Sequence, residues 1–344
     1  MQMAVVGRYF VFAVLLQPWI IPTLVFSQQR CLGGFDVYFI LDKSGSVLPK
    51  YFKGQTVDFV EKTAENFVGK GVRFSFITFS SDTKVVMKLT GDRAKIKEGL
   101  NNLRKVQTGG ATYMSNAIIQ ANNQVKDQAK SQSAFSIFII LTDGKIDDIG
   151  ASNEQSKRAK KAGTIVYAIG VALYDIQQLN ILASKPPQDF VMTEPSYLTL
   201  LNLTSAVTNR TCVEITSVNP QQACLGESNT VTMYGRGFEK FNSAESHSVR
   251  CGFKFNNTYR QVTKASLVEE NRLVCPVPVL NNTESVLMLL VSLNSGQTFV
   301  SSNVNITAKN CTKVENGTKP DTEKDNGTGS GGETKPEVRK LALG

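Results

Sequence analysis

The stretch "FILDKSGSV", residues 39–47, decides the fold, because a run of buried-strand residues ends abruptly on oxygen-bearing side chains. Its first three residues are typical of a strand that is buried on both faces. Asp42, Ser44 and Ser46 follow at alternate positions, where the chain leaves the sheet. This change of residue type predicts that side-chain oxygen atoms gather at the end of the strand.

On either side of this stretch, residues 36–211 alternate between two hydrophobic periods. Further strands are expected at residues 74–79, 137–141 and 165–169, and helices at 47–68, 92–105, 113–125, 153–162 and 197–207. Such alternation predicts an α/β fold with a doubly wound, mostly parallel sheet and helices on both faces. A short run at 83–90 is close enough to the preceding strand for a hairpin, and we expect it to be the antiparallel edge.

After Cys212 the residue pattern changes: short runs of strand-forming residues are separated by turn residues. These runs, at 231–234, 249–255, 273–279, 286–293 and 299–306, predict a small all-β sandwich. Beyond Cys311 the chain has almost no large apolar side chain, so a disordered tail is expected. The predicted division is a signal peptide at 1–27, an α/β domain at 31–212, a β domain at 213–311 and a polar tail at 312–344.

The amino terminus is typical of a secretory signal peptide. Arg8 precedes an uncharged apolar run, and small residues lie near a plausible cleavage point after Ser27. An uncleaved membrane anchor is the alternative, but Pro18 and Pro22 interrupt a segment that is already short for a bilayer. The chain has no other membrane-spanning stretch, so we expect a secreted or extracellular protein, or a cell-surface one if the chain is part of a receptor.

The cysteines agree with an oxidising compartment. There are six, and none forms the Cys-Xaa-Xaa-Cys pair that zinc or thioredoxin chemistry would need. Cys31 and Cys212 flank the α/β domain, whose ends are expected to lie close together, so we pair them. Of the remaining connectivities we favour Cys251–Cys275 and Cys224–Cys311.

Glycosylation motifs cluster after position 200 and leave the front of the chain clear. They are Asn202, Asn209, Asn256, Asn281, Asn305, Asn310, Asn316 and Asn326. A glycoprotein whose working face lies in the front domain is therefore expected. The net charge of +9 could suggest a nucleic-acid or polysaccharide partner. However, the densest basic run, residues 157–161, lacks interleaved aromatics and fits a solvated helix face, so no nucleic-acid partner is predicted.

Oxygen donors converge at one edge of the predicted sheet, since ligands of open α/β sheets bind outside the carboxyl ends of the strands. Asp143 in "IILTDGK" leaves a later strand at the same edge as Asp42, and "QTGGATYMS" places Thr112 before a helix. Each fragment alone could be a helix cap or a turn. Together, Asp42, Ser44, Ser46, Thr112 and Asp143 predict a site for Mg²⁺ or Mn²⁺, which prefer oxygen ligands.

Enzymatic interpretations have less support. No dinucleotide or P-loop glycine motif is present, and the one histidine, His247, falls in the β domain, remote in sequence from Asp42 and Asp143. A metal-assisted hydrolase is the remaining enzymatic alternative, although no general base is obvious. A structural glycoprotein with a vestigial metal site is a further alternative. We predict a binding protein and not an enzyme.

The same residues resemble a known family. "FDVYFILDKSGSV", "LTGDRAKIKEGLNNLRKV", "GGATYM" and "LTDGK" resemble the von Willebrand factor A domain of the anthrax toxin receptor family. "YGRGF" and "CPVPV" are similar to that family's immunoglobulin-like domain, and the resemblance extends through Cys311. It implies an extracellular receptor or adhesion protein in which the five oxygen-bearing residues form a metal-ion-dependent adhesion site.

The resemblance also implies that a carboxylate of a protein ligand completes the coordination of the metal. Extracellular-matrix proteins or a bacterial toxin are the ligands it implies. Two departures lie beside the site: Ala111 and Lys145 stand where the receptors carry acids. Both make the site less negative, so toxin binding and tight metal affinity are not implied.

Overall fold

The computed structural model describes residues 30–69, 71–129, 135–238, 249–255, 259–283 and 285–311. The predicted signal peptide, the predicted polar tail and His247 lie outside these residues. Within the described parts of the chain, no helix is long and apolar enough to cross a membrane.

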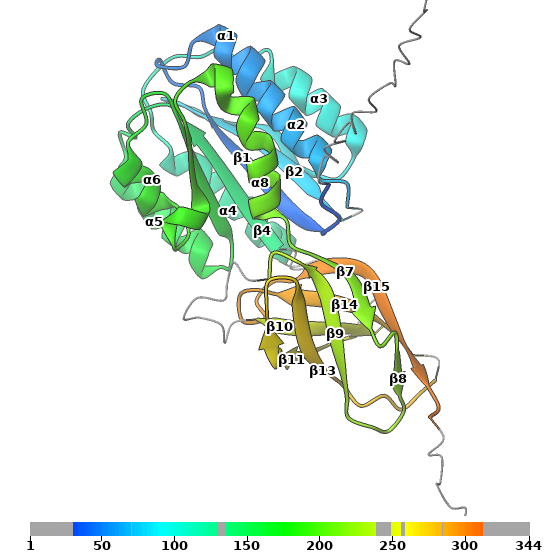
Figure 1. The fold of residues 1–344 in the computed structure, drawn as a ribbon. Helices are drawn as coiled ribbons and strands as arrows, with labels where there is room; N and C mark the ends of the chain where they lie inside the picture. The colour runs from blue at the N-terminus through cyan, green and yellow to red at the C-terminus, as the bar shows by residue number, and fades with distance from the viewer. Residues whose placement is uncertain are drawn as a thin grey trace, which may run out of the picture. The chain divides into compact units, whose positions relative to one another are not determined.

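The front part of the chain forms one six-stranded sheet with the order β3-β2-β1-β4-β5-β6 (Figure 1). All neighbouring strands are parallel except β2 and β3, so β3 is the antiparallel edge that the sequence predicts. The strands are β1 Phe35–Asp42, β2 Arg73–Phe79, β3 Thr83–Thr90, β4 Phe135–Thr142, β5 Ile165–Val171 and β6 Val191–Glu194. The predicted α/β fold class is confirmed.

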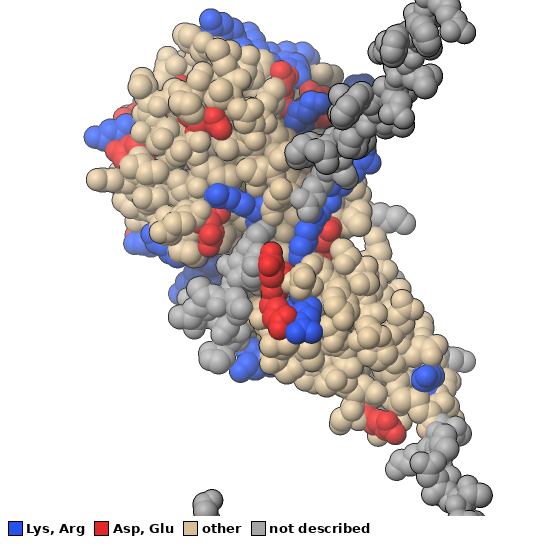
Figure 2. Space-filling model, viewed as in Figure 1, with Lys and Arg blue, Asp and Glu red and all other residues tan. Residues whose placement is uncertain are grey.

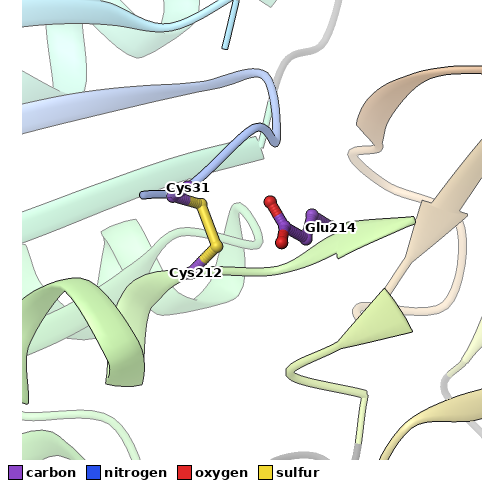
Figure 3. A group of neighbouring side chains, drawn as sticks. All are labelled: Cys31, Cys212 and Glu214. Carbon is purple, nitrogen blue, oxygen red and sulfur yellow. A yellow bond between two sulfur atoms is a disulfide. The ribbon is translucent and has the colours of Figure 1, made fainter. Parts of the chain in front are cut away.

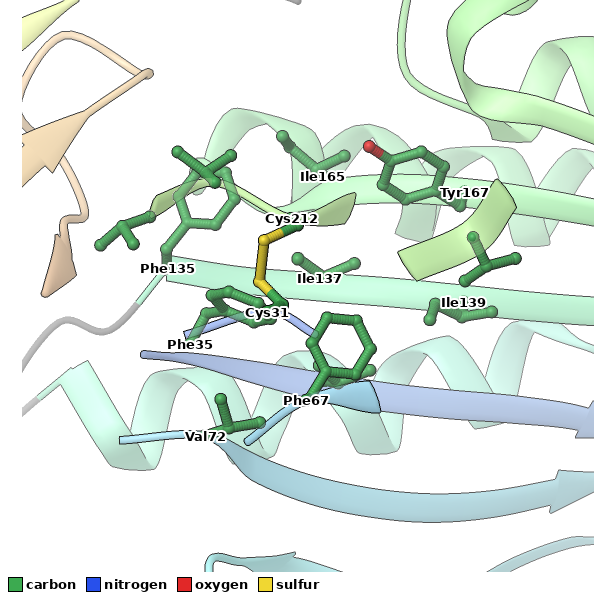
Figure 4. Packing of buried hydrophobic residues seen from close by; sticks show 14 of the residues in the cluster. Cys31, Phe35, Phe67, Val72, Phe135, Ile137, Ile139, Ile165, Tyr167 and Cys212 are labelled. Carbon is green, nitrogen blue, oxygen red and sulfur yellow. A yellow bond between two sulfur atoms is a disulfide. The ribbon is translucent and has the colours of Figure 1, made fainter. Parts of the chain in front are cut away.

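Helices cover both faces of this sheet. They are α1 Pro49–Tyr51, a π-helical turn η1 Phe52–Thr56, α2 Val57–Asn66, α3 Arg93–Leu103, α4 Ser115–Ala129, α5 Ile149–Lys161, α6 Ile176–Leu182, α7 Pro187–Phe190, a 3₁₀ turn η2 Tyr197–Asn202 and α8 Leu203–Thr211. Alternate residues of β1 enter different cores: Phe39 belongs to the core that includes Phe59 of α2, and Ile40 to the core that includes Ile118 of α4. Figure 4 shows the first of these cores around the Cys31–Cys212 disulfide.

Short elements were absent from the sequence prediction. α6, α7 and β6 have seven, four and four residues, too few for a helical or alternating period to stand out. The helix predicted at 47–68 is instead divided among α1, the π-helical turn and α2. Gly54 lies inside that turn, and glycine weakens the preference for a regular α-helix.

The second part of the chain is a sandwich of two β sheets, as predicted. Its strands are β7 Glu214–Asn219, β8 Gln222–Cys224, β9 Asn229–Arg236, β10 Arg250–Phe255, β11 Tyr259–Lys264, β12 Leu267–Val268, β13 Arg272–Val277, β14 Val286–Ser292 and β15 Val300–Lys309. One sheet has the order β11-β10-β14-β15-β8 and the other β12-β13-β9-β7. The sequence indicated β9, β10, β13, β14 and β15 but missed β7, β8, β11 and β12.

Disulfides join segments that are far apart in the chain. Cys31 pairs with Cys212, so both ends of the α/β part are held together. Cys251 of β10 pairs with Cys275 of β13, which links the two sheets of the sandwich. These two of the three predicted pairings are confirmed. Cys224 and Cys311 are also disulfide-bonded.

Candidate metal-binding site

The candidate site begins where two neighbouring strands end at the same edge of the sheet. β1 and β4 are parallel, with Leu41 opposite Leu141, so Asp42 and Asp143 leave the sheet close to each other. Both residues are buried, with 2% and 4% of their surface exposed. Two side-chain carboxyl groups are therefore shielded from water at the edge of the sheet where the strands have their C-terminal ends. We call this edge the carboxyl edge.

Hydroxyl groups of the loop after β1 connect these two acids. The Ser46 hydroxyl donates a hydrogen bond to Asp143 Oδ1 at 2.5 Å, and the hydroxyl oxygens of Ser44 and Ser46 lie 3.0 Å apart. The Ser44 N–H donates to Asp42 Oδ1 at 2.7 Å. Four of the five residues named from the sequence thus form one connected group.

Thr112, the fifth residue, is in a loop that lies against the loop after β1. The Gly109 N–H donates to the Lys43 carbonyl at 2.7 Å, and the Gly45 N–H donates to the Gly110 carbonyl at 2.9 Å. Thr112 itself is 8% exposed. Two backbone hydrogen bonds therefore bring the Thr112 loop beside the serines, although no hydrogen bond from its hydroxyl to the other four is found among the described residues.

The two glycines before Thr112 are required by the backbone at this point. Gly109 and Gly110 have φ values of 146° and 92°, which side chains of L-residues rarely allow. A Cβ on Gly110 would also lie 2.6 Å from Ser81 Oγ. That same hydroxyl accepts a hydrogen bond from the Ala111 N–H at 2.8 Å, so this close contact sets the path of the loop.

Burial makes the negative charge of the two acids unfavourable. Desolvation raises the pKa of Asp42 above its ordinary value, and the nearby charge of Asp143 raises it further. Desolvation likewise raises the pKa of Asp143. Neither has an ion-pair partner among the described residues. A divalent cation would supply the missing positive charge, and carboxylate and hydroxyl oxygens are the ligands that Mg²⁺ and Mn²⁺ prefer.

Lys43 lies between two of the candidate ligands but directs its charge elsewhere. Its ammonium nitrogen is 2.5 Å from Asp82 Oδ1 and donates to Ser80 Oγ at 2.7 Å. The hydrogen bond from Lys43 holds the pKa of Asp82 below its ordinary value. This partner makes it possible for a buried lysine to occupy the motif without neutralising Asp42. Nothing in the sequence pointed to Asp82.

Two further hydroxyl groups contact the acids and were missed from the sequence. The Thr142 hydroxyl donates to Asp42 Oδ2 at 2.6 Å, although only its neighbour Asp143 was named. The hydroxyl of the buried Tyr197, at the start of η2, lies near Asp143, and burial together with the charges of Asp143 and Asp42 raises the pKa of this tyrosine. Its ring stacks on Tyr51 with centroids 5.2 Å apart. Tyr197 is remote in sequence, so no spacing signal could reveal it.

Acids after the Asp143 turn fix the Thr112 loop. The Thr112 N–H donates to Asp147 Oδ2 at 2.7 Å. The N–H groups of Met114 and Ser115 donate to the carboxylate of Asp148 at 2.9 and 3.0 Å. Asp148 thus provides an acceptor for two backbone donors at the start of α4 that have no partner within the helix. The run "KIDD" after the Asp-Gly turn was the available signal for these two positioning residues.

The two departures from the receptor pattern both lie beside this group. Ala111 precedes Thr112 and is half-buried, whereas Lys145 follows Gly144 and is exposed. A Cβ on Gly144 would be only 3.5 Å from Ser46 Oγ, which shows how near the Lys145 turn comes to the serine loop. The ammonium group of Lys145 is thus free to face solvent at this edge.

Among the residues that the structure describes, other groups of chemically active side chains give no second site. Figure 3 shows Cys31, Cys212 and Glu214, whose potential ligand atoms lie close together. The two sulfur atoms are bonded to each other, and the Glu214 carboxylate accepts from the Leu32 N–H at 2.6 Å and pairs with Arg236 at 2.8 Å. A cavity of about 310 Å³ between β3 and α3 is lined by none of the five candidate ligands.

Charged side chains do not form one continuous patch of a single sign on the face shown in Figure 2. Lys and Arg residues there are interspersed with Asp and Glu and separated by uncharged surface. In the basic helix segment, Lys157 pairs with Glu154 at 2.8 Å. This distribution agrees with a solvated helix face.

Comparison with known sequences identifies both parts of the chain. The von Willebrand factor type A domain matches residues 36–206, and the anthrax receptor extracellular domain matches residues 210–313. Matrilin-3 of Gallus gallus is 30% identical over 52% of this chain and 40% of its own length. Integrin alpha-D of Homo sapiens is 31% identical over 48% of this chain and 15% of its own length. The chain thus spans less than half the length of these relatives.

Among solved structures, proximal thread matrix protein 1 from the mussel byssus is similar to this chain. The form with a zinc-occupied MIDAS motif has a TM-score of 0.46 and 22% sequence identity, and covers 52% of this chain and 46% of its own.

Proposed function

The chain belongs to the anthrax toxin receptor-like family, and we propose that it binds a protein ligand through a divalent cation at the carboxyl edge of its sheet. Its similarity to matrilin-3 and integrin alpha-D supports an extracellular adhesion-type binding protein. We propose Mg²⁺ or Mn²⁺ as the cation and Asp42, Ser44, Ser46, Thr112 and Asp143 as the residues that hold it. An acidic side chain of the ligand completes the coordination.

One observation carries this proposal: two buried acids share a network of hydroxyl groups but have no basic partner among the described residues. Such an arrangement is unfavourable for the protein alone, because both carboxyl groups are desolvated. Because the hydroxyl groups are neutral, a cation there would keep much of its charge, and it would attract a further anionic oxygen. In an adhesion-type protein, this attraction between the cation and an anionic oxygen would hold the ligand.

The protein's own residues divide the work. The serine loop and the two acids supply oxygen atoms, while Asp147 and Asp148 hold the Thr112 loop through its backbone N–H groups. Lys43 is kept away from the acids by Asp82. The exposed Lys145 offers an incoming carboxylate a second positive group.

We also propose that the chain is a secreted or cell-surface glycoprotein, with domains at 31–212 and 213–311. Five of the acceptor asparagines lie in the described residues, and these five, Asn202, Asn209, Asn281, Asn305 and Asn310, are all exposed. Matrix proteins are the ligand class we favour. A bacterial toxin is a less favoured ligand because Ala111 and Lys145 remove negative charge beside the site.

A structural glycoprotein with a vestigial site is the second candidate. The exposed Lys145 favours it, because its charge opposes cation binding. A metal-assisted hydrolase has no such supporting observation, since no histidine lies among the described residues and the two site acids are engaged by hydroxyl donors.

An array of matrix proteins, probed with the purified chain in Mg²⁺ and again in excess chelator, tests the proposal. We expect at least one ligand whose binding disappears with chelator and returns with Mg²⁺. Binding should fail in Thr112→Ala and persist in Asp58→Ala. Asp58 is the control because its carboxylate is not part of the site and pairs with Arg104 at a distance of 2.9 Å. Ligand binding that persists in chelator would place the interaction on another face, and no binding at all would favour the structural alternative.

A further inference from the structure

Large apolar side chains are exposed around the candidate metal site. Leu173 is 83% exposed, Leu198 68%, Leu48 48% and Tyr113 47%. Single exposed apolar residues are common on proteins, but several gathered at one place mark an interaction surface. We call these four residues the apolar rim.

Each member of the rim is placed by its neighbours in the chain. Leu48 follows the serine loop by two residues, and Tyr113 follows Thr112 directly. Leu198 is next to Tyr197, whose hydroxyl lies near Asp143. Leu173 follows β5, which lies beside β4 in the sheet. All four therefore belong to loops or first helical turns at the carboxyl edge, the end of the sheet where Figure 1 shows α1.

The charges near the rim favour an acidic ligand. Lys145 is exposed there, and the proposed cation adds further positive charge. Two of the acids near the rim are engaged by backbone donors: Asp147 accepts from the Thr112 N–H at 2.7 Å, and Asp175 accepts from the N–H groups of Gln177 and Gln178 at 2.9 and 3.2 Å. An incoming carboxylate thus meets positive charge in the centre and apolar surface around it.

We infer that this face recognises a loop of a partner protein in which an acidic residue is flanked by bulky apolar residues. This inference rests on the proposed function, because the acid of the partner enters the cation site. The flanking apolar side chains pack on Leu173 and Leu198 and exclude water from the charged centre. Water exclusion strengthens the charged contact, and the apolar contacts select the partner.

A phage library of disulfide-closed peptides, each with a fixed central glutamate and random neighbours, tests the inference. The full chain is immobilised in Mg²⁺ and bound phage are released with chelator. We expect apolar residues to be enriched beside the glutamate. The selected peptides should bind Leu173→Ser/Leu198→Ser about tenfold more weakly than the unaltered chain, since each substitution removes a large apolar contact.

A matched double variant and a metal titration separate the possible outcomes. Val68→Ser/Ile181→Ser also removes two exposed apolar side chains, but from the segment after α2 and from the last turn of α6 respectively, and should leave peptide binding unchanged. Both double variants should bind Mn²⁺ as the unaltered chain does. Chelator-released peptides without apolar enrichment would overturn the inference alone, whereas an absence of chelator-released peptides would overturn the proposed function with it.

The inference would also be overturned if the apolar rim bound a second copy of the chain or a lipid surface. Rim-dependent dimerisation in Mg²⁺, detected by sedimentation, would assign the surface to a second copy of the chain. Rim-dependent cosedimentation with phosphatidylcholine vesicles would assign it to a lipid surface.

Discussion

Asp42 shows how one residue links the site to the stability of the protein. Its pKa is raised above the ordinary value of 3.8 by burial, so the folded state binds a proton more tightly than the unfolded chain does. The stability that this proton provides is present at low pH and is lost as the pH rises through the folded-state pKa. Near neutral pH without metal, the raised pKa of Asp42 therefore destabilises the fold.

Asp42→Asn should consequently stabilise the metal-free protein. In chelator near pH 7 we expect its free energy of unfolding to rise by about 1 kcal/mol, because an amide removes the buried charge and keeps the shape. The gain should shrink as the pH falls below the ordinary value of 3.8, where the aspartate becomes protonated in both the folded and the unfolded state. Urea unfolding followed by circular dichroism measures this. A variant less stable than the unaltered protein in chelator at neutral pH would show that Asp42 is stabilising even without a cation.

Lys145 gives a second prediction at this scale. Lys145→Glu should tighten Mn²⁺ binding by about threefold at low ionic strength, because it replaces a repelling charge by an attracting one at an exposed position. The gain should fall in high salt, where exposed charges are screened. Lys161→Glu, on the exposed end of α5, is the control and should have no effect. Equal changes in both variants would show a general effect of net charge.

At the scale of elements, the loop from Gly109 to Thr112 depends on its glycines. Gly110→Ala should lower the free energy of unfolding by about 1–3 kcal/mol and weaken metal binding, because the positive φ and the Ser81 hydroxyl both oppose a side chain. Gly150→Ala, in α5 with open space around it, should instead stabilise by about 0.5–1 kcal/mol. Thermal unfolding compares the two. A harmless Gly110→Ala would mean that the loop can take another path.

The sequence predicted an element where the apolar run was long, as in a strand whose residues are all buried. β1 and β4 were found because all eight residues of each are buried, and their parallel order then placed Asp42 beside Asp143. The contributions of Tyr197 and Asp82 could not be predicted, because they depend on how η2 and the turn after β2 pack against the site. A hydrogen bond between residues so far apart in sequence leaves no local pattern.

At the scale of the whole molecule, the disulfides are the strongest constraint on the unfolded chain. The Cys31–Cys212 bond spans 181 residues and Cys251–Cys275 spans 24. In the chain-entropy model, opening the first by Cys31→Ser/Cys212→Ser should cost up to about 5 kcal/mol, and opening the second about 3 kcal/mol. Denaturant unfolding of the two double variants measures the difference. A smaller cost for the longer loop would indicate that the unfolded chain retains structure between residues 31 and 212.

The account depends on a divalent cation at the carboxyl edge, and isothermal titration of the whole protein with Mn²⁺ tests it most directly. We predict one site per chain in the unaltered protein and in Asp58→Ala, and none in Asp42→Ala, whose remaining hydroxyl groups are too weakly attractive to hold the ion. Circular dichroism should show that all three proteins are folded. Unchanged Mn²⁺ binding in Asp42→Ala, or no binding in the unaltered protein, would contradict the account.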